Sequence, residues 1–399
     1  MRVLFLSPRQ CWPTLSGAKL RDYYFAKALG ERAQLTYFFF AERGAPAMTR
    51  EQMPFAEKLA AISAPHTYTP GKIVRGLLGR WPLPVVNYTT IEMKRAVSEL
   101  VAGTSFDFVH LDVIQMAAYE QLIVRLQPNA RIIYNWHNIE SELMRRYAAS
   151  APSLPRRIYG RLTARSLEAL ERRLLSGSFG HLVCSEREKE RLLQIVPSAR
   201  IAVIENGVDT AAFSPKALTG AERKRLVFVG SMNYHANIEA AVWFTRHVWP
   251  AVHRQFPDWS LTLVGSNPAP AVLELAGDAV EVTGTVPSVA PYYNDAFAAI
   301  VPLRTGGGTR LKILEAMAAK VPVISTTLGA EGLAVSAGQN ILIADSESSW
   351  MEAFAALSAS EERWNAVASA GRSLVESRYD WQVLGRTLYE TYREWLDSA

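Results

Sequence analysis

The residues best suited to chemistry follow a short apolar run in the second half of the chain. Residues 301–318 read VPLRTGGGTRLKILEAMA, which indicates a strand, a glycine loop and a helix. We expect Thr309 to be the N-cap of this helix, so that Arg310 and Lys312 fall in its first turn. A cation beside the positive end of a helix dipole is unfavourable by roughly 0.3–1 kcal/mol. An anion on the loop reverses this sign, because the free amides and both cations then attract it.

The three loop glycines, Gly306, Gly307 and Gly308, allow the backbone to approach such an anion closely. The pattern therefore favours a phosphate or diphosphate site. The alternative is a plain helix end, with Lys312 paired to a glutamate three residues later and Arg310 in solvent.

That glutamate, Glu315, stands on an otherwise apolar helix face, where an unpaired carboxylate is costly to bury. One interpretation is that it faces a ligand and accepts two hydrogen bonds from a ribose diol. The other is a salt bridge to Lys312.

His137 directly follows the apolar run 131–136, and the ligand sites of parallel sheets lie at such strand ends. There an imidazole can orient a hydroxyl or stabilise charge at a reacting carbon. A purely structural histidine is the alternative. No nucleophilic carboxylate is evident beside His137, so we expect no long-lived covalent intermediate.

Metal ligation has no support in the sequence. The chain contains no Asp-x-Asp pair, and its seven histidines are not at ligand spacing. We therefore expect chemistry that needs neither a metal nor another cofactor.

Two further loops carry weaker signals. Ser16 and Gly17 follow the first strand and would form either a second phosphate-facing loop or a plain helix cap. Asn237, followed by an acidic residue at Glu239, is most simply the N-cap of another helix.

The elements that position these residues are short apolar runs alternating with segments of helical spacing, such as residues 20–29, 239–248 and 311–319. Continuously apolar runs are typical of strands covered on both faces. This alternation predicts βαβ units in parallel sheets, hence an α/β fold with two sheets. Strands are predicted at residues 3–6, 35–40, 106–111, 131–136, 181–184, 201–204, 226–229, 260–264, 280–282, 298–302, 321–325 and 341–343.

A length of 399 residues favours two domains. A strand ends near residue 204, and turn residues then lead to a fresh strand at 226. We predict an N-terminal domain over 1–205, a second domain over 206–378, and a closing helix within 379–399.

The composition excludes several classes of protein. Forty-three Lys and Arg against 38 Asp and Glu leave a net charge of only +5, too mild for a dedicated nucleic-acid binder. Two cysteines cannot form a disulfide framework. The first apolar run is too short for a signal peptide, and no apolar run is long enough to span a bilayer. We expect a cytoplasmic protein, and a further hypothesis is peripheral contact with the inner face of the cell membrane.

Two basic amphipathic stretches suggest that contact. Residues 71–81 interleave three cations with apolar residues that end at Trp81. Residues 156–175 carry six arginines and two glutamates, with apolar residues near helical spacing. Such segments suit anionic lipid surfaces. We favour lipid contact for the first stretch, and for the second a solvated helix laced by pairs such as Glu168 with Arg172.

Several pieces of sequence recur together in one known family. LEAMAAKVPVISTTLGAEGL, residues 314–333, resembles the donor-site segment of family 4 retaining glycosyltransferases, which have the GT-B fold. The supporting pieces span nearly the whole chain. They are Pro13 with Ser16-Gly17, Asn135-Trp-His137-Asn, Glu205-Asn-Gly-Val-Asp209, Val229-Gly230-Ser231, Gly284-Thr-Val286 and Tyr379-Asp-Trp381.

The resemblance implies two Rossmann-like domains facing across a cleft, with the last helix packing back on the first domain. It implies that Glu315 holds the donor ribose and that His137 contacts the transferred sugar. Val286 would lie beside the nucleobase, and Gly17 near the distal phosphate. Amides around Thr309 and Leu311 would hold the diphosphate.

Two departures from the family pattern stand out. The family often has a first glutamate where this chain has Gly307. Its usual Arg and Lys after the glycine of the second-half loop, here Gly230, are replaced by Ser231 and, approximately, Asn237. The resemblance therefore implies a subgroup with a GGGTRLKILEAMA-type loop, in which Arg310 and Lys312 supply the missing charge.

The expected activity is transfer of a sugar from a UDP- or GDP-sugar, with retention, to a glycan or lipid-linked acceptor of cell-surface polysaccharide or glycolipid synthesis. A nucleotide-sugar epimerase of the same fold is one alternative. A non-catalytic nucleotide-sugar-binding partner in a membrane glycan-assembly complex is the other, and it is favoured by Gly307.

Overall fold

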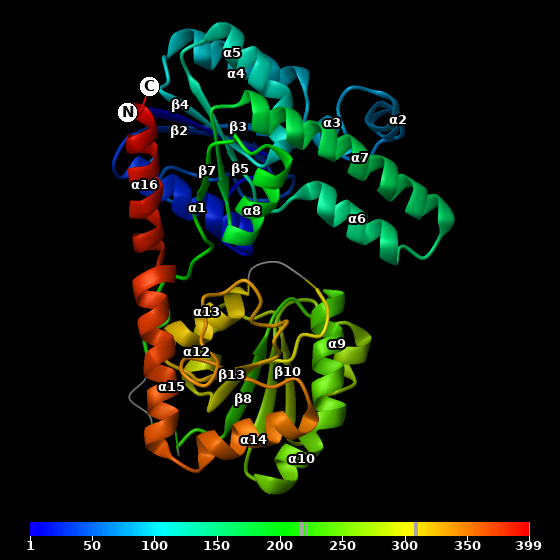
Figure 1. The fold of residues 1–399 in the computed structure, drawn as a ribbon, viewed down its shortest axis with the longest axis vertical. Helices are drawn as coiled ribbons and strands as arrows, with labels where there is room; N and C mark the ends of the chain where they lie inside the picture. The colour runs from blue at the N-terminus through cyan, green and yellow to red at the C-terminus, as the bar shows by residue number, and fades with distance from the viewer. Residues whose placement is uncertain (216–218, 221, 307–309, 399) are drawn as a thin grey trace. The chain divides into compact units, whose positions relative to one another are not determined.

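The computed structural model describes residues 1–215, 219–220, 222–306 and 310–398. The chain divides into two compact units (Figure 1). The first comprises residues 1–205 and 385–399, and the second comprises residues 206–384. Each unit contains its own parallel sheet and its own hydrophobic core.

The first unit has, over its described residues, a seven-stranded parallel sheet in the order β3-β2-β1-β4-β5-β6-β7. Its strands are β1 (Arg2–Ser7), β2 (Gln34–Ala41), β3 (Lys58–Ser63), β4 (Phe108–Asp112), β5 (Arg131–Asn135), β6 (Gly180–Val183) and β7 (Ile201–Val203). Its helices are α1 (Gly17–Gly30), α2 (Pro70–Leu78), α3 (Leu83–Asn87), α4 (Ile91–Gly103), α5 (Glu120–Leu126), α6 (Glu140–Ser150), α7 (Leu154–Gly177) and α8 (Glu186–Ile195), with a 3₁₀ turn at Ile114–Tyr119.

The second unit has, over its described residues, a six-stranded parallel sheet in the order β10-β9-β8-β11-β12-β13. Its strands are β8 (Arg225–Val229), β9 (Ser260–Val264), β10 (Val280–Gly284), β11 (Ala298–Val301), β12 (Val323–Ser325) and β13 (Leu342–Ile343). Its helices are α9 (His235–Trp243), α10 (Trp249–Gln255), α11 (Pro270–Leu273), α12 (Ala290–Asn294), α13 (Leu311–Ala318), α14 (Glu347–Ser358) and α15 (Glu361–Leu374), with π-helical turns at Phe244–Val248 and Val375–Tyr379.

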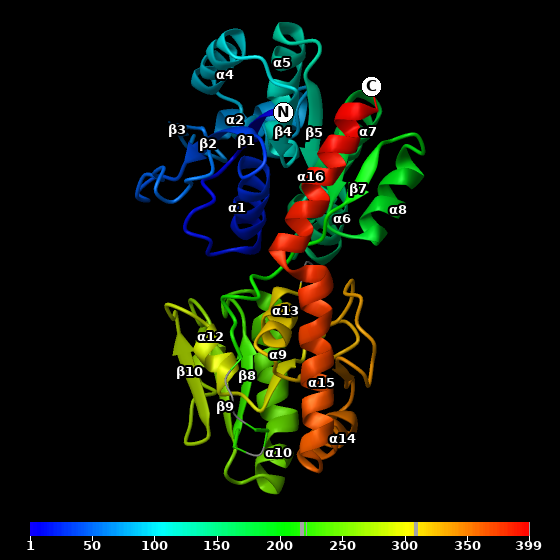
Figure 2. The same ribbon diagram turned by 90° about the vertical axis from the view of Figure 1, so that its left-hand side faces the viewer.

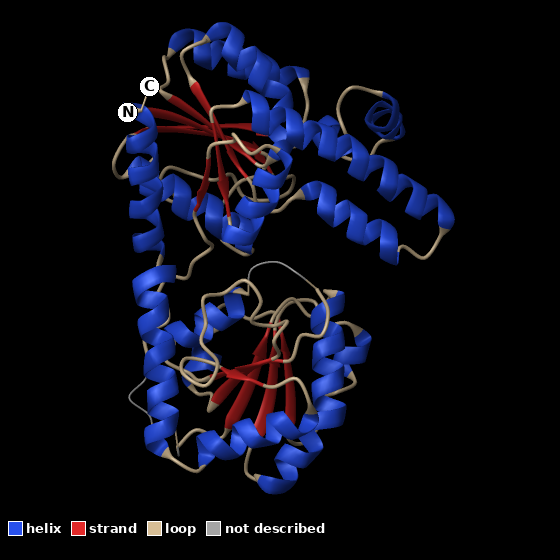
Figure 3. Ribbon diagram, in the orientation of Figure 1, coloured by secondary structure: helices blue, strands red, loops and turns tan. Residues whose placement is uncertain are grey.

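Helices flank the central strands of each unit (Figure 3). In the first unit the chain moves one way across the sheet through α1 and the other way through α5. Right-handed crossovers therefore place these two helices on opposite faces, as Figure 2 shows. Strands covered on both faces are continuously apolar, and β4 and β11 are buried throughout. The predicted α/β fold with two Rossmann-like parallel sheets is confirmed.

All twelve predicted strands lie among the described residues and are present, but β3 was not predicted. This edge strand, KLAAIS, has a short apolar run in which two of four residues are alanines of low β-propensity, and none of its residues is fully buried. The helix predicted over residues 239–248 begins earlier, at His235, and turns π-helical at Phe244. Asn237 is therefore inside α9, and its prediction as an N-cap was wrong.

The last helix, α16 (Trp381–Asp397), begins in the second unit and continues into the first. Gly385 lies close to Ala28 of α1, and Tyr392 packs against Phe108 of β4. Tyr392 Oη and His110 Nδ1 are 2.6 Å apart. Trp395 packs edge-on against Phe179. An apolar stripe at helical spacing thus attaches the end of the chain to the first sheet.

Lipid contact of residues 71–81 stays a prediction, whereas one ion pair predicted within residues 156–175 is different in the structure. Trp81 is half-buried, and the guanidinium of Arg173 lies 4.5 Å from its ring centroid, so a cation–π contact accounts for an aromatic ring among charges. Lys72 Nζ donates to two backbone carbonyls, those of His66 and Asn87. The predicted pairing of Glu168 with Arg172 was wrong, because Glu168 pairs with Arg145 at 2.6 Å.

Helices α6 and α7 form a hairpin whose far end extends away from the sheet of its unit (Figure 1). On α7 the side chains of Leu154, Ile158 and Leu162 are 68%, 48% and 51% exposed. These residues are four apart and form one stripe along the helix. Three exposed arginines, residues 157, 161 and 165, form the neighbouring stripe. No Asp or Glu occurs between residues 142 and 168.

Candidate functional site

Strand order reverses once in each sheet, between β1 and β4 and between β8 and β11. Parallel sheets bind ligands beyond the carboxyl ends of their strands at such points. The residues that the sequence singled out gather at these two places. In the second unit they follow β8 and β11, and in the first they follow β1, β4 and β5.

Lys312 is the centre of the group in the second unit. Its Nζ donates to Asn237 Oδ1 over 2.8 Å, and Asn237 Nδ2 donates to the carbonyl oxygen of Ser231 over 2.9 Å. A Cβ on Gly230 would lie 2.9 Å from Lys312 Nζ. The ammonium is therefore in contact with the turn after β8. Burial lowers the pKa of Lys312 to about 7, with Arg310 acting in the same direction and Glu315 opposing it.

Glu315 does not pair with Lys312. Tyr293 Oη donates to Glu315 Oε2 over 3.1 Å and lies at the same distance from the carbonyl oxygen of Lys312. Burial raises the pKa of Glu315, while Tyr293 and Lys312 oppose that rise. No hydrogen bond joins Glu315 Oε1 to another residue in the described part of the chain.

Arg310 takes a different position from the one predicted. It occupies the N-cap position of α13, and its side chain is only 5% exposed. Its guanidinium donates to the carbonyl oxygen of Leu328 over 3.1 Å. Arg310 therefore ties the start of α13 to the turn after β12, instead of standing in the first helical turn beside Lys312.

The other predicted donor-site residues in this unit are placed as follows. Gly306 has a φ of +98°, and a Cβ there would lie 2.9 Å from Ala236 Cβ, so a side chain would be strained and crowded. Ser231 is exposed, and Val286 and Leu311 are half-buried. Gly307, Gly308 and Thr309 lie outside the described residues, and with them the predicted glycine loop and N-cap.

Gly17 is the first residue of α1 in the first unit. The predicted cap is present there, because Ser16 Oγ accepts from the backbone N–H of Lys19 over 3.3 Å.

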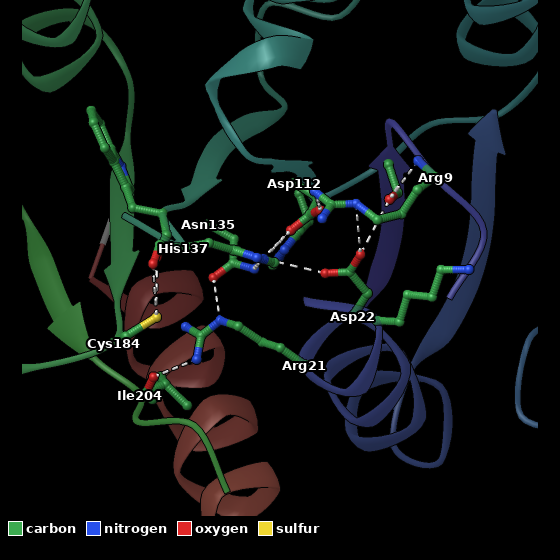
Figure 4. A network of polar contacts seen from close by, with 12 residues as sticks. Arg9, Arg21, Asp22, Asp112, Asn135, His137, Cys184 and Ile204 are labelled. Carbon is green, nitrogen blue, oxygen red and sulfur yellow. Dashed lines mark hydrogen bonds and ion pairs between the residues drawn. The ribbon is translucent and has the colours of Figure 1, made fainter. Parts of the chain in front are cut away.

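His137 lies at the centre of a buried polar cluster in the same unit (Figure 4). Its Nε2 is 3.0 Å from Asp112 Oδ1 and 3.3 Å from Asp22 Oδ1. The side chain of His137 is 11% exposed, whereas both carboxylates are fully buried. Two carboxylates, brought by α1 and β4 from elsewhere in the sequence, therefore lie beside His137, and the absence of a long-lived covalent intermediate stays a prediction.

Cations and amides surround these carboxylates. Arg9 Nη2 lies 3.4 Å from Asp112 Oδ2, and Arg9 Nε lies 3.6 Å from Asp22 Oδ2. Asn135 Nδ2 donates to Asp112 Oδ1 over 2.8 Å. Burial opposes ionisation of Asp112, but His137 and Arg9 outweigh it and lower its pKa. The pKa of Asp22 is raised by burial and by the charge of Asp112.

Within the described part of the chain, Asp22, Asp112 and His137 are the group whose donor atoms, all within 4.8 Å of one another, could surround a metal ion. Asn135 and Arg9 already direct N–H groups at the oxygens of Asp112. Donors at these positions suit a hydrogen-bond network better than a cation site, so metal independence stays a prediction.

Sequence reasoning missed Arg9, Asp22, Asp112 and Tyr293. Asp112 and Arg9 had a usable signal, since they end or follow apolar strands at the point where strand order reverses. Asp22 and Tyr293 had none, because each is one polar residue within a helix.

Comparisons with known proteins match both parts of the chain. Residues 23–212 match the family model "Glycosyltransferase Family 4", and residues 223–360 match the model "Glycosyl transferases group 1". A curated relative, an uncharacterized 44.6 kDa protein from the cps region of Klebsiella pneumoniae, is 31% identical over 132 residues. That alignment spans only 31% of this chain and 34% of the relative.

Solved structures of the same fold align over nearly the whole chain. Sucrose-phosphate synthase from Thermosynechococcus elongatus gives a TM-score of 0.72 at 18% identity, with all of both chains covered. Anabaena HepE in complex with UDP and glucose gives 0.66 at 14% identity, covering 98% of this chain and 99% of that one. With both units matched by family models and the fold shared throughout, the chain is a GT-B glycosyltransferase of the family 4 and group 1 type.

Proposed function

We propose that this protein transfers a sugar from a UDP- or GDP-sugar to a glycan or lipid-linked acceptor, with retention of configuration and without a metal. The observation that carries the proposal is Lys312. A half-buried ammonium, held by Asn237 against the turn after β8, sits where the strand order of the second sheet reverses. A diphosphate bound at this point of the sheet would pair with the ammonium and neutralise its charge.

The residues around Lys312 would each bind a different part of the nucleotide sugar. Lys312 and the first amides of α13, from Leu311 onward, would bind the diphosphate. Glu315 Oε1 would accept from the ribose hydroxyls, with Oε2 held by Tyr293. Val286 would lie beside the base. In the first unit, His137 would contact the transferred sugar, and Gly17 would lie near the distal phosphate.

The departing nucleoside diphosphate gains negative charge as the glycosidic bond breaks. A fixed ammonium and fixed amides stabilise that charge without reorganisation. This arrangement supports the subgroup that the GGGTRLKILEAMA segment implies. In that subgroup Lys312, on the helix, takes the place of the family's loop lysine, whose approximate position is occupied here by Asn237. Arg310, whose guanidinium donates to the carbonyl oxygen of Leu328, would add its positive charge at the start of α13.

The first experiment is a thermal-shift screen of the full chain against UDP, GDP, ADP and their sugars. We expect a uridine or guanosine diphosphate sugar to raise the unfolding midpoint and Lys312→Met to abolish most of that rise. Gly230→Ala should have a similar effect, because its Cβ would meet Asn237 and Lys312. Gly277→Ala, where a Cβ meets nothing within 4 Å, is the matched control.

The second experiment is product analysis with a responding donor and an acceptor panel. Transfer that continues in excess chelator with an unchanged anomeric configuration is the expected result. Interconversion of the donor without an acceptor would instead identify an epimerase. Donor binding without hydrolysis or transfer across the panel would identify a non-catalytic partner.

We further infer a role in cell-surface polysaccharide synthesis at the inner face of the membrane. The cps-region relative supports the pathway. No helix in the described part of the chain is both long and apolar enough to cross a bilayer. The exposed surface formed by Leu154, Ile158 and Leu162, with arginines beside it, suits anionic lipid better than residues 71–81 do.

Sedimentation with vesicles tests this inference. Phosphatidylglycerol vesicles should carry the protein down and phosphatidylcholine vesicles should not. Ile158→Ser with Leu162→Ser should release it, whereas Leu78→Ser, an 85% exposed residue of α2, should not. Equal retention of all three proteins would remove the hairpin from the proposal.

A further inference from the structure

Two carboxylates converge on one nitrogen of His137. Asp112 is the last residue of β4 and Asp22 belongs to α1, and both place Oδ1 within 3.3 Å of His137 Nε2. An unprotonated Nε2 would direct its lone pair at two carboxylate oxygens. This nitrogen therefore carries a hydrogen. Asn135 Nδ2, 3.1 Å from Nε2, is turned towards Asp112 because Arg21 Nε donates to Asn135 Oδ1 over 3.0 Å.

With both carboxylates ionised, the charges of the cluster balance when the imidazole is a cation. Asp22 and Asp112 contribute two negative charges, and Arg9, which contacts both, contributes one positive charge. A protonated His137 supplies the second. Because the two carboxylates are fully buried, water does not solvate their negative charge, and a neighbouring cation has to balance it.

The surrounding ionisable groups act in both directions. Glu140 and Glu188 lie close enough to attract a positive charge on His137, and that charge acts to lower the pKa of each glutamate. Arg21 is the opposing cation nearby. His110 does not add a charge, because burial lowers its pKa to about 3. For His137 itself, burial lowers the pKa, but Asp112 and Asp22 outweigh burial and the net shift is upward.

The second ring nitrogen faces outward from this cluster. No acceptor among the described residues receives a hydrogen bond from His137 Nδ1, and the imidazole is partly exposed whereas Asp22 and Asp112 are fully buried. A protonated ring therefore has one N–H fixed by the protein and one N–H available to a substrate oxygen.

We propose that His137 works as a fixed imidazolium that donates a hydrogen bond through Nδ1 to the bound sugar, with Asp112 and Asp22 as positioning residues that keep it charged. This role rests on the proposed glycosyl transfer. It assigns His137 the part of a donor and stabilising cation, and no proton leaves the ring. The opposite assignment, a general base, would require Nδ1 to be unprotonated in the resting enzyme.

Nuclear magnetic resonance of the full chain with labelled histidine tests the charge without any substrate. His137→Gln identifies the His137 signals among the seven histidines. We expect an imidazolium at pH 7 in the parent, and a titration at clearly lower pH in both Asp112→Asn and Asp22→Asn. Glu190→Gln, an exposed carboxylate of α8, is the control. A neutral His137 ring at pH 7, or a titration unmoved by either variant, overturns the proposal whatever the protein's activity.

The pH dependence of turnover tests the role. If His137 must be charged, kcat falls as pH rises through its pKa, and Asp112→Asn moves this alkaline limb to lower pH. Asp112→Glu should return the limb part of the way. A limb on the acid side that depends on His137 would show a base and overturn the proposal. Failure of all transfer would reject the proposed function while leaving the resonance result intact.

Discussion

Ionisable side chains in both units owe their properties to burial more than to residue type. Burial lowers the pKa of Lys312 and raises the pKa of Glu171, each to about 7. The pKa of His137 is raised against the effect of burial, because Asp112 and Asp22 outweigh it. What differs is the partner. His137 has two carboxylates that favour its charged form, whereas the ammonium of Lys312 has an amide oxygen of Asn237 and the ring of Phe228, whose centroid is 4.4 Å away. In the free enzyme Lys312 is therefore close to half-protonated at pH 7, whereas the upward shift of the His137 pKa favours the charged imidazole.

Donor affinity should consequently depend on pH through Lys312. A diphosphate favours the charged amine, so binding takes up a proton once the pH exceeds about 7. We expect the affinity for a nucleotide sugar to fall above pH 7, approaching about tenfold per pH unit, and the affinity for the nucleoside to stay level. Titration calorimetry from pH 6 to 9 measures both.

Lys312→Arg should flatten this profile, because a guanidinium stays protonated. Lys224→Met removes an exposed lysine of the same unit and should leave the profile as in the parent. A steep profile in Lys312→Arg would show that another group takes up the proton.

Glu171 of α7 should make stability depend on pH. It is fully buried, its Oε1 accepts from the backbone N–H of Ser141 over 2.8 Å, and burial raises its pKa to about 7. A carboxyl group with a raised pKa contributes stability that is full below its ordinary pKa of about 4.5 and is lost as pH rises through about 7. The loss is on the order of 3 kcal/mol.

Glu171→Gln keeps the acceptor and never ionises, so it should raise the unfolding midpoint at pH 8 and change it little at pH 5. Chemical denaturation at both pH values measures this difference. Glu168→Gln, on the exposed side of the same helix, is the control. An equal effect of Glu171→Gln at both pH values would contradict the assignment.

Among the helices and strands, the polar residues of the candidate site lie at or near helix starts and strand ends. The start of α13 is held from two sides, by Arg310 on the carbonyl of Leu328 and by Lys312 on Asn237 of α9. The start of α1 is capped by Ser16, and one turn later the same helix delivers Asp22 to His137. Helices with fixed origins can place a polar group deep in a unit, because the cap and the buried face set their position along the sheet.

The last helix should be a stabilising element of the first unit. Trp395 is 8% exposed and packs against Phe179 and Gly180. Trp395→Ala should lower the free energy of unfolding by about 3–5 kcal/mol, because it removes a large buried ring. Glu390→Ala, on the exposed face of α16, should change it by less than about 0.5 kcal/mol. Denaturant titration measures both, and similar values for the two variants would show that α16 contributes little.

The whole molecule contains two parallel sheets whose strands follow the same order, apart from one further edge strand in the first sheet. Each reverses its strand order once, and each collects polar residues at that point. The cation that suits a diphosphate lies in the second unit, while the charged histidine lies in the first. In the proposed function, donor recognition and the chemistry at the sugar would thus be contributed by separate units of one chain.

Hydrogen exchange of the full chain should separate these contributions. UDP alone should slow exchange of amides after β8 and at the start of α13, and leave β4 and β5 unchanged, because the nucleotide contacts proposed here, apart from the one near Gly17, belong to the second unit. The complete nucleotide sugar should additionally slow exchange next to His137. Protection by UDP that is confined to the first unit would contradict this division.

The apolar pattern of the chain was enough to predict twelve strands, the α/β class and the final helix, because burial on both faces of a parallel strand leaves a continuous local signal. It also singled out Lys312, Glu315 and His137 from their neighbours. Partners were beyond it. Asp22, Asp112 and Arg9 meet His137 only because α1, β4 and the turn after β1 converge in the fold, and Arg310 faces Leu328 because of tertiary packing. Local composition decides which segments are buried, whereas the charge that a buried group carries depends on atoms far away in the chain, and only the tertiary structure brings those atoms together.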